Sequence, residues 1–256
     1  VLSRRRNQLM NLPAQQLLLD LGPAAQPATL DNFVVGNNRE LLSRLRAFAD
    51  PGVFDQIYLW GPAGSGRSHL LAGARALAEE RGRPIVFAHG HEIGTELSTP
   101  PGSLVIIDGV ETLTADGQIT LFRIFNAARL VGLALLLSGS APPLALENIL
   151  REDLRTRLGA ALIYEVHPLD DAAKATALRQ HAHQRGIRLD EAVIDYLLHH
   201  GQRHLPALLA TLDHADRVSL EKKRSLPLPL LREVMHNREA ATAQPDTGSP
   251  HESGTV

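Results

Sequence analysis

The chain has 256 residues, of which 44% are apolar and 21% charged, and these proportions are typical of a globular protein with a sizeable core. Its formal net charge of −2 gives no sign of the basic surface of a dedicated DNA-binding domain, so we expect no direct sequence-specific DNA binding. The absence of cysteine excludes disulfides and thiolate zinc sites, and no apolar run reaches the roughly 18 residues of a membrane span, so we expect a cytoplasmic protein without membrane contact.

Residues 1–27 contain three prolines around a short apolar run, and we interpret them as an N-terminal arm rather than as a folded domain. From about residue 28 onward, short apolar segments alternate with segments of helical periodicity. Strands are predicted at 56–60, 84–89, 103–109, 133–140 and 161–166, and helices at 68–80 and 119–130. This alternation predicts an α/β domain over residues 28–167, in which a parallel sheet is covered by helices on both faces.

The strand pattern ends at His167-Pro168, and residues 168–236 show only helical periodicity. Three amphipathic segments are separated by Gly186 and Gly201, and a shorter helical segment follows Pro229. We therefore predict a small all-helical lid after the α/β domain. Residues 237–256 lack apolar anchors, and their composition is typical of disorder.

The segment GPAGSGRS at residues 61–68 has the spacing of a phosphate-binding loop of the form G-x-x-x-x-G-K-[ST], except that Arg67 replaces the lysine. A predicted strand precedes it and a predicted helix follows it, so backbone N–H groups and the helix N-terminus can bind a phosphate group. Ser68 stands where a hydroxyl can reach Mg²⁺ between phosphates. Because a planar guanidinium is bulkier than an ammonium, we expect Arg67 to preserve nucleotide binding more readily than the alignment of a terminal phosphate for attack. The alternative is a tight strand-to-helix turn without a ligand.

Asp108 ends an apolar strand segment, at the position where a carboxylate orients the water ligands of Mg²⁺. P-loop hydrolases of this kind usually have a second acidic residue next in the chain, which polarises the attacking water, but Gly109 occupies that position. Glu111 lies two residues further along, beyond the predicted end of the strand, and we do not assign it that role. The sequence thus predicts a site that holds a nucleotide, with weak or no hydrolysis of its own.

Several segments together resemble the AAA+ domain of the bacterial replication initiator DnaA. They are 30–42 before the loop, 57–71 with the loop, 104–113 with the acidic strand, 135–143 at the first sensor, 152–166 at the arginine finger and 201–213 at the second sensor. The resemblance implies a three-layer P-loop AAA+ fold with a helical lid, and ADP or ATP with Mg²⁺ as the cofactor. The cofactor-binding residues that follow from the loop and from the resemblance are Gly61, Gly64, Gly66, Arg67, Ser68, His69, Asp108 and Arg203, with Ser68 and Asp108 on the Mg²⁺ side.

Four residues receive roles only through this resemblance. Arg157 corresponds to the arginine finger, and the alternative is a surface arginine in a cluster of three. Arg203 corresponds to the second sensor on the lid, and the alternative is an exposed arginine at a helix end. Ser138 and Ser140 lie at the first sensor, and both differ from the polar residue usual there.

The arginine in the loop, the short arm and the polar segment after residue 236, where DnaA has its DNA-binding domain, are similar to the Hda family of DnaA-related regulators. In that family the arm carries a peptide of the form Gln-Leu-x-Leu-x-Leu that docks on the β sliding clamp. Residues 16–21 (QLLLDL) fit this spacing, with Gln16, Leu17, Leu19 and Leu21 as the clamp-binding residues. An extended peptide can place such alternate side chains in apolar pockets. The alternative is that these leucines pack the arm against the α/β domain.

The resemblance implies a regulatory AAA+ protein that docks on the clamp and stimulates hydrolysis of ATP bound to DnaA, which switches initiation off. Arg157 would then act in trans, and the protein's own site would not need to turn over. The main alternative is an ATPase of the related helicase-loader group, which predicts turnover by the isolated protein. A third hypothesis is a passive adaptor between DnaA and the clamp, for which Arg157 is dispensable. A second copy of this chain is a further partner that the sequence leaves open.

Overall fold

The computed structural model of the chain describes residues 27–201, 204–221, 228–233 and 235. The expected clamp-binding residues (Gln16, Leu17, Leu19 and Leu21), Arg203 and the segment 237–256 lie outside the described residues. None of the helices in the described ranges has the length and apolarity that crossing a membrane requires.

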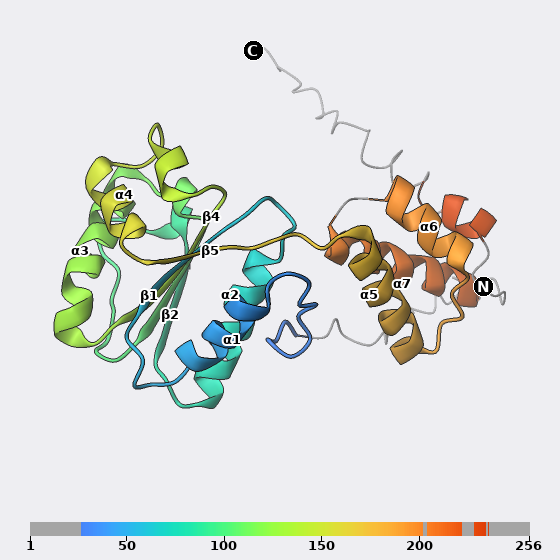
Figure 1. The fold of residues 1–256 in the computed structure, drawn as a ribbon, viewed down its shortest axis with the longest axis horizontal. Helices are drawn as coiled ribbons and strands as arrows, with labels where there is room; N and C mark the ends of the chain where they lie inside the picture. Colours follow the sequence, from blue (N-terminus) through green and yellow to red (C-terminus); the bar gives the residue numbers. More distant parts are fainter. Residues whose placement is uncertain (1–26, 202–203, 222–227, 234, 236–256) are drawn as a thin grey trace, which may run out of the picture.

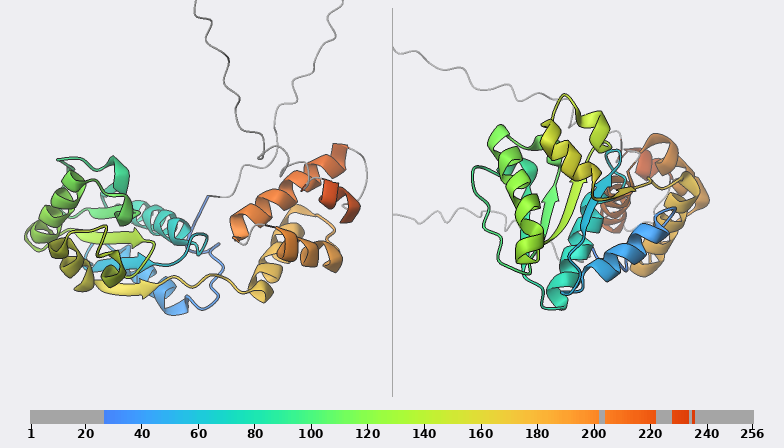
Figure 2. Two further views of the ribbon diagram at one scale, coloured as in Figure 1. Left: turned by 90° about the horizontal axis from the view of Figure 1, so that it is seen from above. Right: turned by 60° about the vertical axis from the view of Figure 1, so that its left-hand side comes forward.

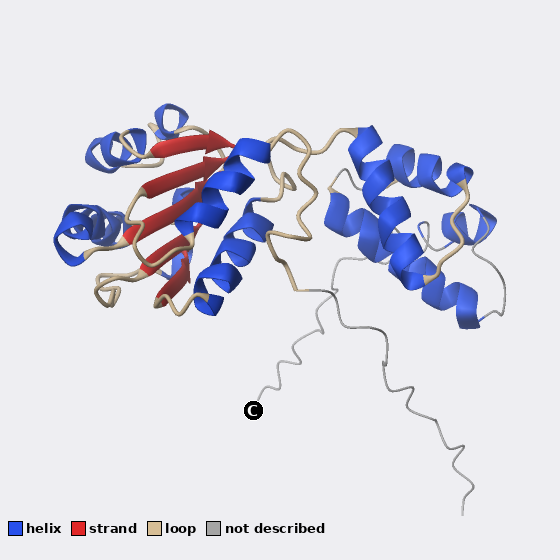
Figure 3. Ribbon diagram, turned by 60° about the horizontal axis from the view of Figure 1, so that its bottom comes forward, coloured by secondary structure: helices blue, strands red, loops and turns tan. Residues whose placement is uncertain are grey.

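A five-stranded parallel sheet forms the centre of the larger part of the molecule, and its strands are red in Figure 3. The strands are β1 (Gln56–Trp60), β2 (Ile85–His89), β3 (Leu104–Asp108), β4 (Ala134–Gly139) and β5 (Leu162–Glu165). Their order across the sheet is β2-β3-β4-β1-β5, and every pair is parallel. The carboxyl ends of the strands therefore meet at one edge of the sheet, and in Figure 3 this edge faces the lid.

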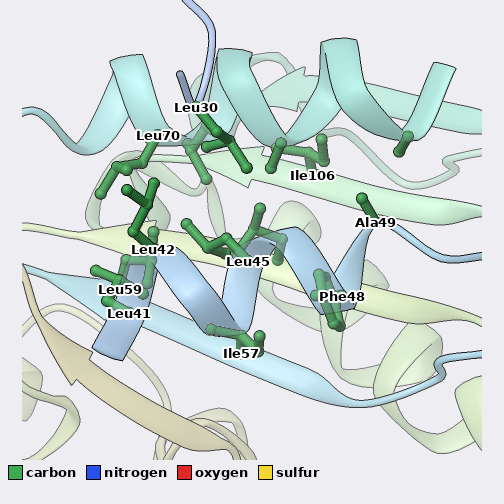
Figure 4. Close-up of a cluster of buried hydrophobic side chains, with 14 of the residues drawn as sticks. Leu30, Leu41, Leu42, Leu45, Phe48, Ala49, Ile57, Leu59, Leu70 and Ile106 are labelled. Atoms are coloured by element: carbon green, nitrogen blue, oxygen red, sulfur yellow. The ribbon is translucent and has the colours of Figure 1, made fainter. Parts of the chain in front are cut away.

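Helices cover the sheet on both faces, which confirms the predicted three-layer α/β fold (Figure 1). Helices α1 (Arg39–Phe48) and α2 (Arg67–Glu80) pack on one face, and α3 (Ala115–Val131) and α4 (Glu152–Gly159) pack on the other. Figure 4 shows the first of these cores, in which leucines of α1 and α2 contact the side chains of Ile57 on β1 and Ile106 on β3. A second core lies under α3 and α4 and includes Leu121, Phe125 and Leu154.

Helices α1 and α4 are not among those that the sequence pattern predicts. Leu41, Leu42, Leu45 and Phe48 of α1 are buried at helical spacing, but Asn38 at its N-cap makes no side-chain capping bond. The Asn38 side chain instead donates to His167 O (2.9 Å) and accepts from His167 N (2.8 Å). This paired contact holds the segment before α1 against the start of the connection to the lid.

The lid is a separate group of helices joined to the sheet domain after β5, as Figure 2 shows. It contains α5 (Asp171–Arg185), α6 (Glu191–His200) and α7 (Leu205–Glu221), and residues 228–233 are also helical. The predicted stop at Gly186 corresponds to the end of α5, where this glycine takes a φ of 69°. The lid has a core of its own, which includes Leu178, Ile194 and Leu212.

Candidate functional site: a phosphate-binding loop and an exposed arginine

The loop 61–66 connects β1 to α2 at the carboxyl edge of the sheet, and α2 begins at Arg67. Gly64 and Gly66 take φ values of 78° and 101°, which side-chain-bearing residues rarely adopt. There is also no space for a Cβ on either residue: it would lie 2.3 Å from His204 Cβ at Gly64 and 2.8 Å from Phe33 Cε2 at Gly66. The glycines therefore allow a close backbone turn at a helix N-terminus, the geometry that binds phosphate through backbone N–H groups.

Gly61, the residue directly after β1, is constrained by Val166, the residue directly after β5. A Cβ at this position would lie 2.6 Å from the carbonyl oxygen of Val166, whose own N–H donates to Trp60 O (2.7 Å). The entrance of the loop is thus clamped between β1 and the end of β5. All three glycines that the sequence assigns to the cofactor have a steric reason to be glycine.

Ser68 and Asp108 lie together, as the proposed Mg²⁺ chemistry requires. The Ser68 hydroxyl donates to Asp108 Oδ2 at 2.9 Å, which joins the first turn of α2 to the end of β3. The other carboxylate oxygen, Oδ1, accepts from the hydroxyl of Ser138 on β4, and Ser138 Oγ accepts from Gly109 N at 3.0 Å. Ser138 is fully buried. A hydroxyl and a carboxylate at this separation are hard oxygen donors suited to Mg²⁺ and its water ligands.

Ser138 therefore has a larger role than its sequence suggested. It lies in the segment that resembles the first sensor, and its hydroxyl fixes both the Asp108 carboxylate and the backbone turn after it. The pairing that brings β4 next to β3 is a tertiary feature, so the sequence contains no local signal for this contact.

Arg67, at the lysine position of the loop, has an acidic neighbour that the sequence did not assign to the site. Arg67 Nη1 lies 3.8 Å from Glu111 Oε1, and the two side chains are only 16% and 21% exposed. Gly109 takes a φ of 78° directly after β3, and the chain then forms a 3-10 turn, η2 (Val110–Thr112), that carries Glu111 back toward the loop. A glycine directly after the acidic strand, followed two residues later by a carboxylate, is the signal that could have indicated this contact.

Tyr58 on β1 lies within the electrostatic reach of the same pair. Its hydroxyl donates to Ala141 O at 2.7 Å, and its side chain is completely buried. Burial raises the pKa of the Tyr58 phenol well above its usual value; Glu111 raises it further, and Arg67 acts in the opposite direction. The two charged residues thus influence a buried group inside the sheet domain.

His69 faces away from the Ser68–Asp108 pair. Its Nε2 lies 2.9 Å from Thr29 O and 3.0 Å from Asn32 Oδ1, and its ring is 5.5 Å from that of Phe33. These contacts belong to the segment before α1. His69 thus joins the first turn of α2 to the segment before α1, away from the Ser68–Asp108 pair.

Arg157 is located on α4, in the helical layer opposite to the one that contains α2 (Figure 1). Its Nη2 donates to Asn126 Oδ1 on α3 at 2.6 Å, and its guanidinium carbon lies 5.7 Å from the centre of the Phe122 ring. Arg157 is exposed, and both of these partners are uncharged. By contrast Arg151, at the N-cap of the same helix, forms an ion pair with Asp153 at 2.9 Å. Arg157 is thus held in place while its positive charge stays available at the surface.

Comparison with known proteins finds similarities to both parts of the molecule. Residues 171–235 match the family described as Hda, lid domain. Domain III of DnaA from Thermotoga maritima superimposes with a TM-score of 0.69 at 17% identity, covering 84% of this chain and 98% of that one. AMPPCP-bound DnaA from Aquifex aeolicus gives 0.64 at 20% identity, covering 84% and 70%. The RuvB Holliday junction branch migration motor of Thermotoga maritima gives 0.64 at 17% identity, covering 82% and 72%, so the fold is shared well beyond DnaA.

Proposed function

We propose that this chain, an Hda-like AAA+ protein homologous to DnaA, regulates replication initiation by stimulating the hydrolysis of ATP bound to DnaA. The observation that carries this proposal is the setting of Arg157. Its guanidinium is exposed and held by uncharged partners, in the layer opposite to the helix of its own phosphate-binding loop. An arginine so placed is suited to act on a nucleotide held by a neighbouring protein.

The chain's own loop fits a nucleotide. Residues 61–66 provide backbone N–H groups and the N-terminus of α2 for the phosphates, while Ser68 and Asp108 form the pair that would hold Mg²⁺. Arg203, through the resemblance, would contact the phosphates from the lid. The lid itself touches the loop, since His204 lies against Gly64. AMPPCP in the similar DnaA structure supports nucleotide binding, and we take ADP or ATP with Mg²⁺ as the cofactor.

Arg157 would act by placing positive charge next to the γ-phosphoryl group of ATP on DnaA. An arginine supplied in trans in this way raises the rate of phosphoryl transfer by about 10³- to 10⁵-fold in other nucleotide hydrolases. The contacts to Asn126 and Phe122 would fix the guanidinium before the partner arrives, which lowers the entropy lost on docking.

Docking on the β sliding clamp is the second part of the proposal. Gln16, Leu17, Leu19 and Leu21 fit the peptide of the Hda family, and the Hda-type lid supports that family assignment. An extended peptide of this kind would bind by alternate side chains in apolar pockets. The clamp would then bring Arg157 to DnaA only where DNA has been loaded for replication.

The proposal is tested by the hydrolysis of radiolabelled ATP preloaded on DnaA, in the presence of clamp-loaded DNA. The intact protein should accelerate hydrolysis, and Arg157→Ala should lose at least about 100-fold of that stimulation. Arg151→Ala removes another exposed arginine, at the N-cap of the same helix, and should behave as the intact protein. Full stimulation by Arg157→Ala would leave the passive adaptor as the better explanation.

A second pair of samples tests the docking step. Replacing Gln16 and Leu17 by alanine should abolish stimulation when the clamp is present, without changing nucleotide binding to the chain's own loop. Substitution of Leu18 and Asp20, the two residues that face away in the expected peptide, serves as the matched control. If both double variants stimulate equally, residues 16–21 do not dock on the clamp.

A further inference from the structure

The contact between Arg67 and Glu111 places a negative charge inside the nucleotide site. Arg67 stands where the loop motif has the lysine that reaches the β- and γ-phosphates. Its guanidinium is 3.8 Å from Glu111 Oε1, and both side chains are largely buried. Because burial reduces screening by water and salt, this attraction is stronger than that of an exposed pair.

The second oxygen of the Glu111 carboxylate also contributes negative charge to the nucleotide site. Glu111 Oε2 is buried and has no hydrogen-bond partner among the described residues. A carboxylate oxygen in this setting repels any further anion that approaches it, since no donor there offsets its charge.

We propose that Glu111 makes this site favour a nucleoside diphosphate over a nucleoside triphosphate. A β-phosphate can be bound by the loop N–H groups and by the Ser68 side of the site while Arg67 keeps its contact with Glu111. A third phosphate requires the same guanidinium and brings additional negative charge next to the Glu111 carboxylate. Glu111 thus competes with the third phosphate for the Arg67 guanidinium. This inference rests on the nucleotide site of the proposed function.

A different role for Glu111 is water activation, as a replacement for the missing acid after Asp108. That role needs a carboxylate directed at the attacking water, whereas Glu111 Oε1 faces the Arg67 guanidinium. The two roles predict opposite results when the charge is removed. Loss of a water-activating base lowers ATP turnover and leaves triphosphate affinity unchanged, while loss of a competitor tightens triphosphate binding.

The experiment is calorimetric titration of the full chain with Mg-ADP and with Mg-AMPPCP, which separates binding from hydrolysis. The intact protein should bind ADP more tightly than AMPPCP. In Glu111→Gln the AMPPCP affinity should rise about tenfold relative to that of ADP, because a like charge is removed from the triphosphate side. Glu111→Ala removes the same charge without adding amide donors and should shift the ratio in the same direction.

Glu80→Gln is the matched control. It removes one carboxylate from the exposed C-terminal end of α2, the helix whose other end carries Arg67, and should leave the ratio of affinities unchanged. An unchanged ratio in both Glu111 variants would overturn the inference while leaving the nucleotide site intact. Failure of the intact protein to bind either nucleotide would overturn the proposed site itself, and the inference with it.

Discussion

The guanidinium of Arg67 lies beside a carboxylate inside the nucleotide site, whereas that of Arg157 lies on the surface of α4 with an amide and an aromatic ring as partners. The two residues are the same chemical group in opposite settings. An arginine whose charge is compensated within its own chain is suited to holding a ligand already bound there. An arginine that is oriented but uncompensated is suited to a phosphate that arrives with another protein.

This comparison depends first on the loop that presents Arg67. Gly64→Ala would force a residue with a Cβ into a φ of 78° and against His204, and we expect the loop to move away from its phosphate-binding form. Strain of about 2–3 kcal/mol corresponds to a loss of about 100-fold in nucleotide affinity. Nucleotide titration of the purified variant measures this directly.

Gly82→Ala is the matched control, which distinguishes a general effect of backbone strain from a specific loss of nucleotide binding. Gly82 has a similar φ of 73°, but a Cβ there meets nothing within 4 Å and the residue is far along the chain from the loop. It should lower thermal stability slightly and leave nucleotide affinity unchanged. Equal affinity losses in both variants would show that the loop conformation is not what binds the nucleotide.

Because Ser138 is fully buried, its substitution should have a large effect on the free energy of unfolding. Ser138→Ala would leave Asp108 Oδ1 and Gly109 N without their shared partner in a buried site, and such losses cost about 1–3 kcal/mol. The free energy of unfolding in urea should fall by that amount. Ser140→Ala, two residues along on an exposed position, should change it by less than about 0.5 kcal/mol. Similar values for the two variants would contradict the bridging role of Ser138.

The fold was largely accessible from the sequence, because the strands are continuous apolar runs and the loop motif fixes the position of β1 and α2. The helix α1 was harder to predict, since the polar group of Asn38 is used 129 residues away at His167 rather than as a local cap. The contact of Glu111 with Arg67 depends on the backbone turn at Gly109, and that of Arg157 with Asn126 depends on how α3 and α4 pack. Gly109 is the one local signal for the first contact, whereas the second leaves no pattern in the local sequence.

Tyr58 provides a test of burial in the sheet domain, beside Glu111 and Arg67, that needs no nucleotide. Because its pKa is raised in the folded protein, the unfolded chain loses the phenol proton first, at a pH near its usual value of about 10. Above that pH the unfolded state binds fewer protons than the folded state, so the free energy of unfolding falls as the pH rises. We expect a loss of about 1 kcal/mol between pH 10 and pH 11.

Urea unfolding at pH 9, 10 and 11 measures this slope. Tyr58→Phe should be less stable than the intact protein at pH 9, because the bond to Ala141 O is lost, but its stability should fall less steeply with pH. Tyr164→Phe makes the same substitution on the adjacent strand β5, at a partly buried position. The prediction fails if the two variants have the same slope.

The smallest effect is expected from a substitution that gives Arg157 a carboxylate partner, as Arg67 already has. Asn126→Asp would give the guanidinium a carboxylate partner in place of the amide that now lies 2.6 Å away. An exposed ion pair of this kind is worth about 0.2–1 kcal/mol, so stimulation of DnaA-bound ATP hydrolysis should fall by up to about fivefold. Asn126→Ala removes the contact without adding charge and should lose less. Because surface pairs are screened by salt, the difference between Asp and Ala should shrink as salt is raised. A larger loss for Ala than for Asp would mean that Arg157 needs to be held more than it needs to be uncompensated.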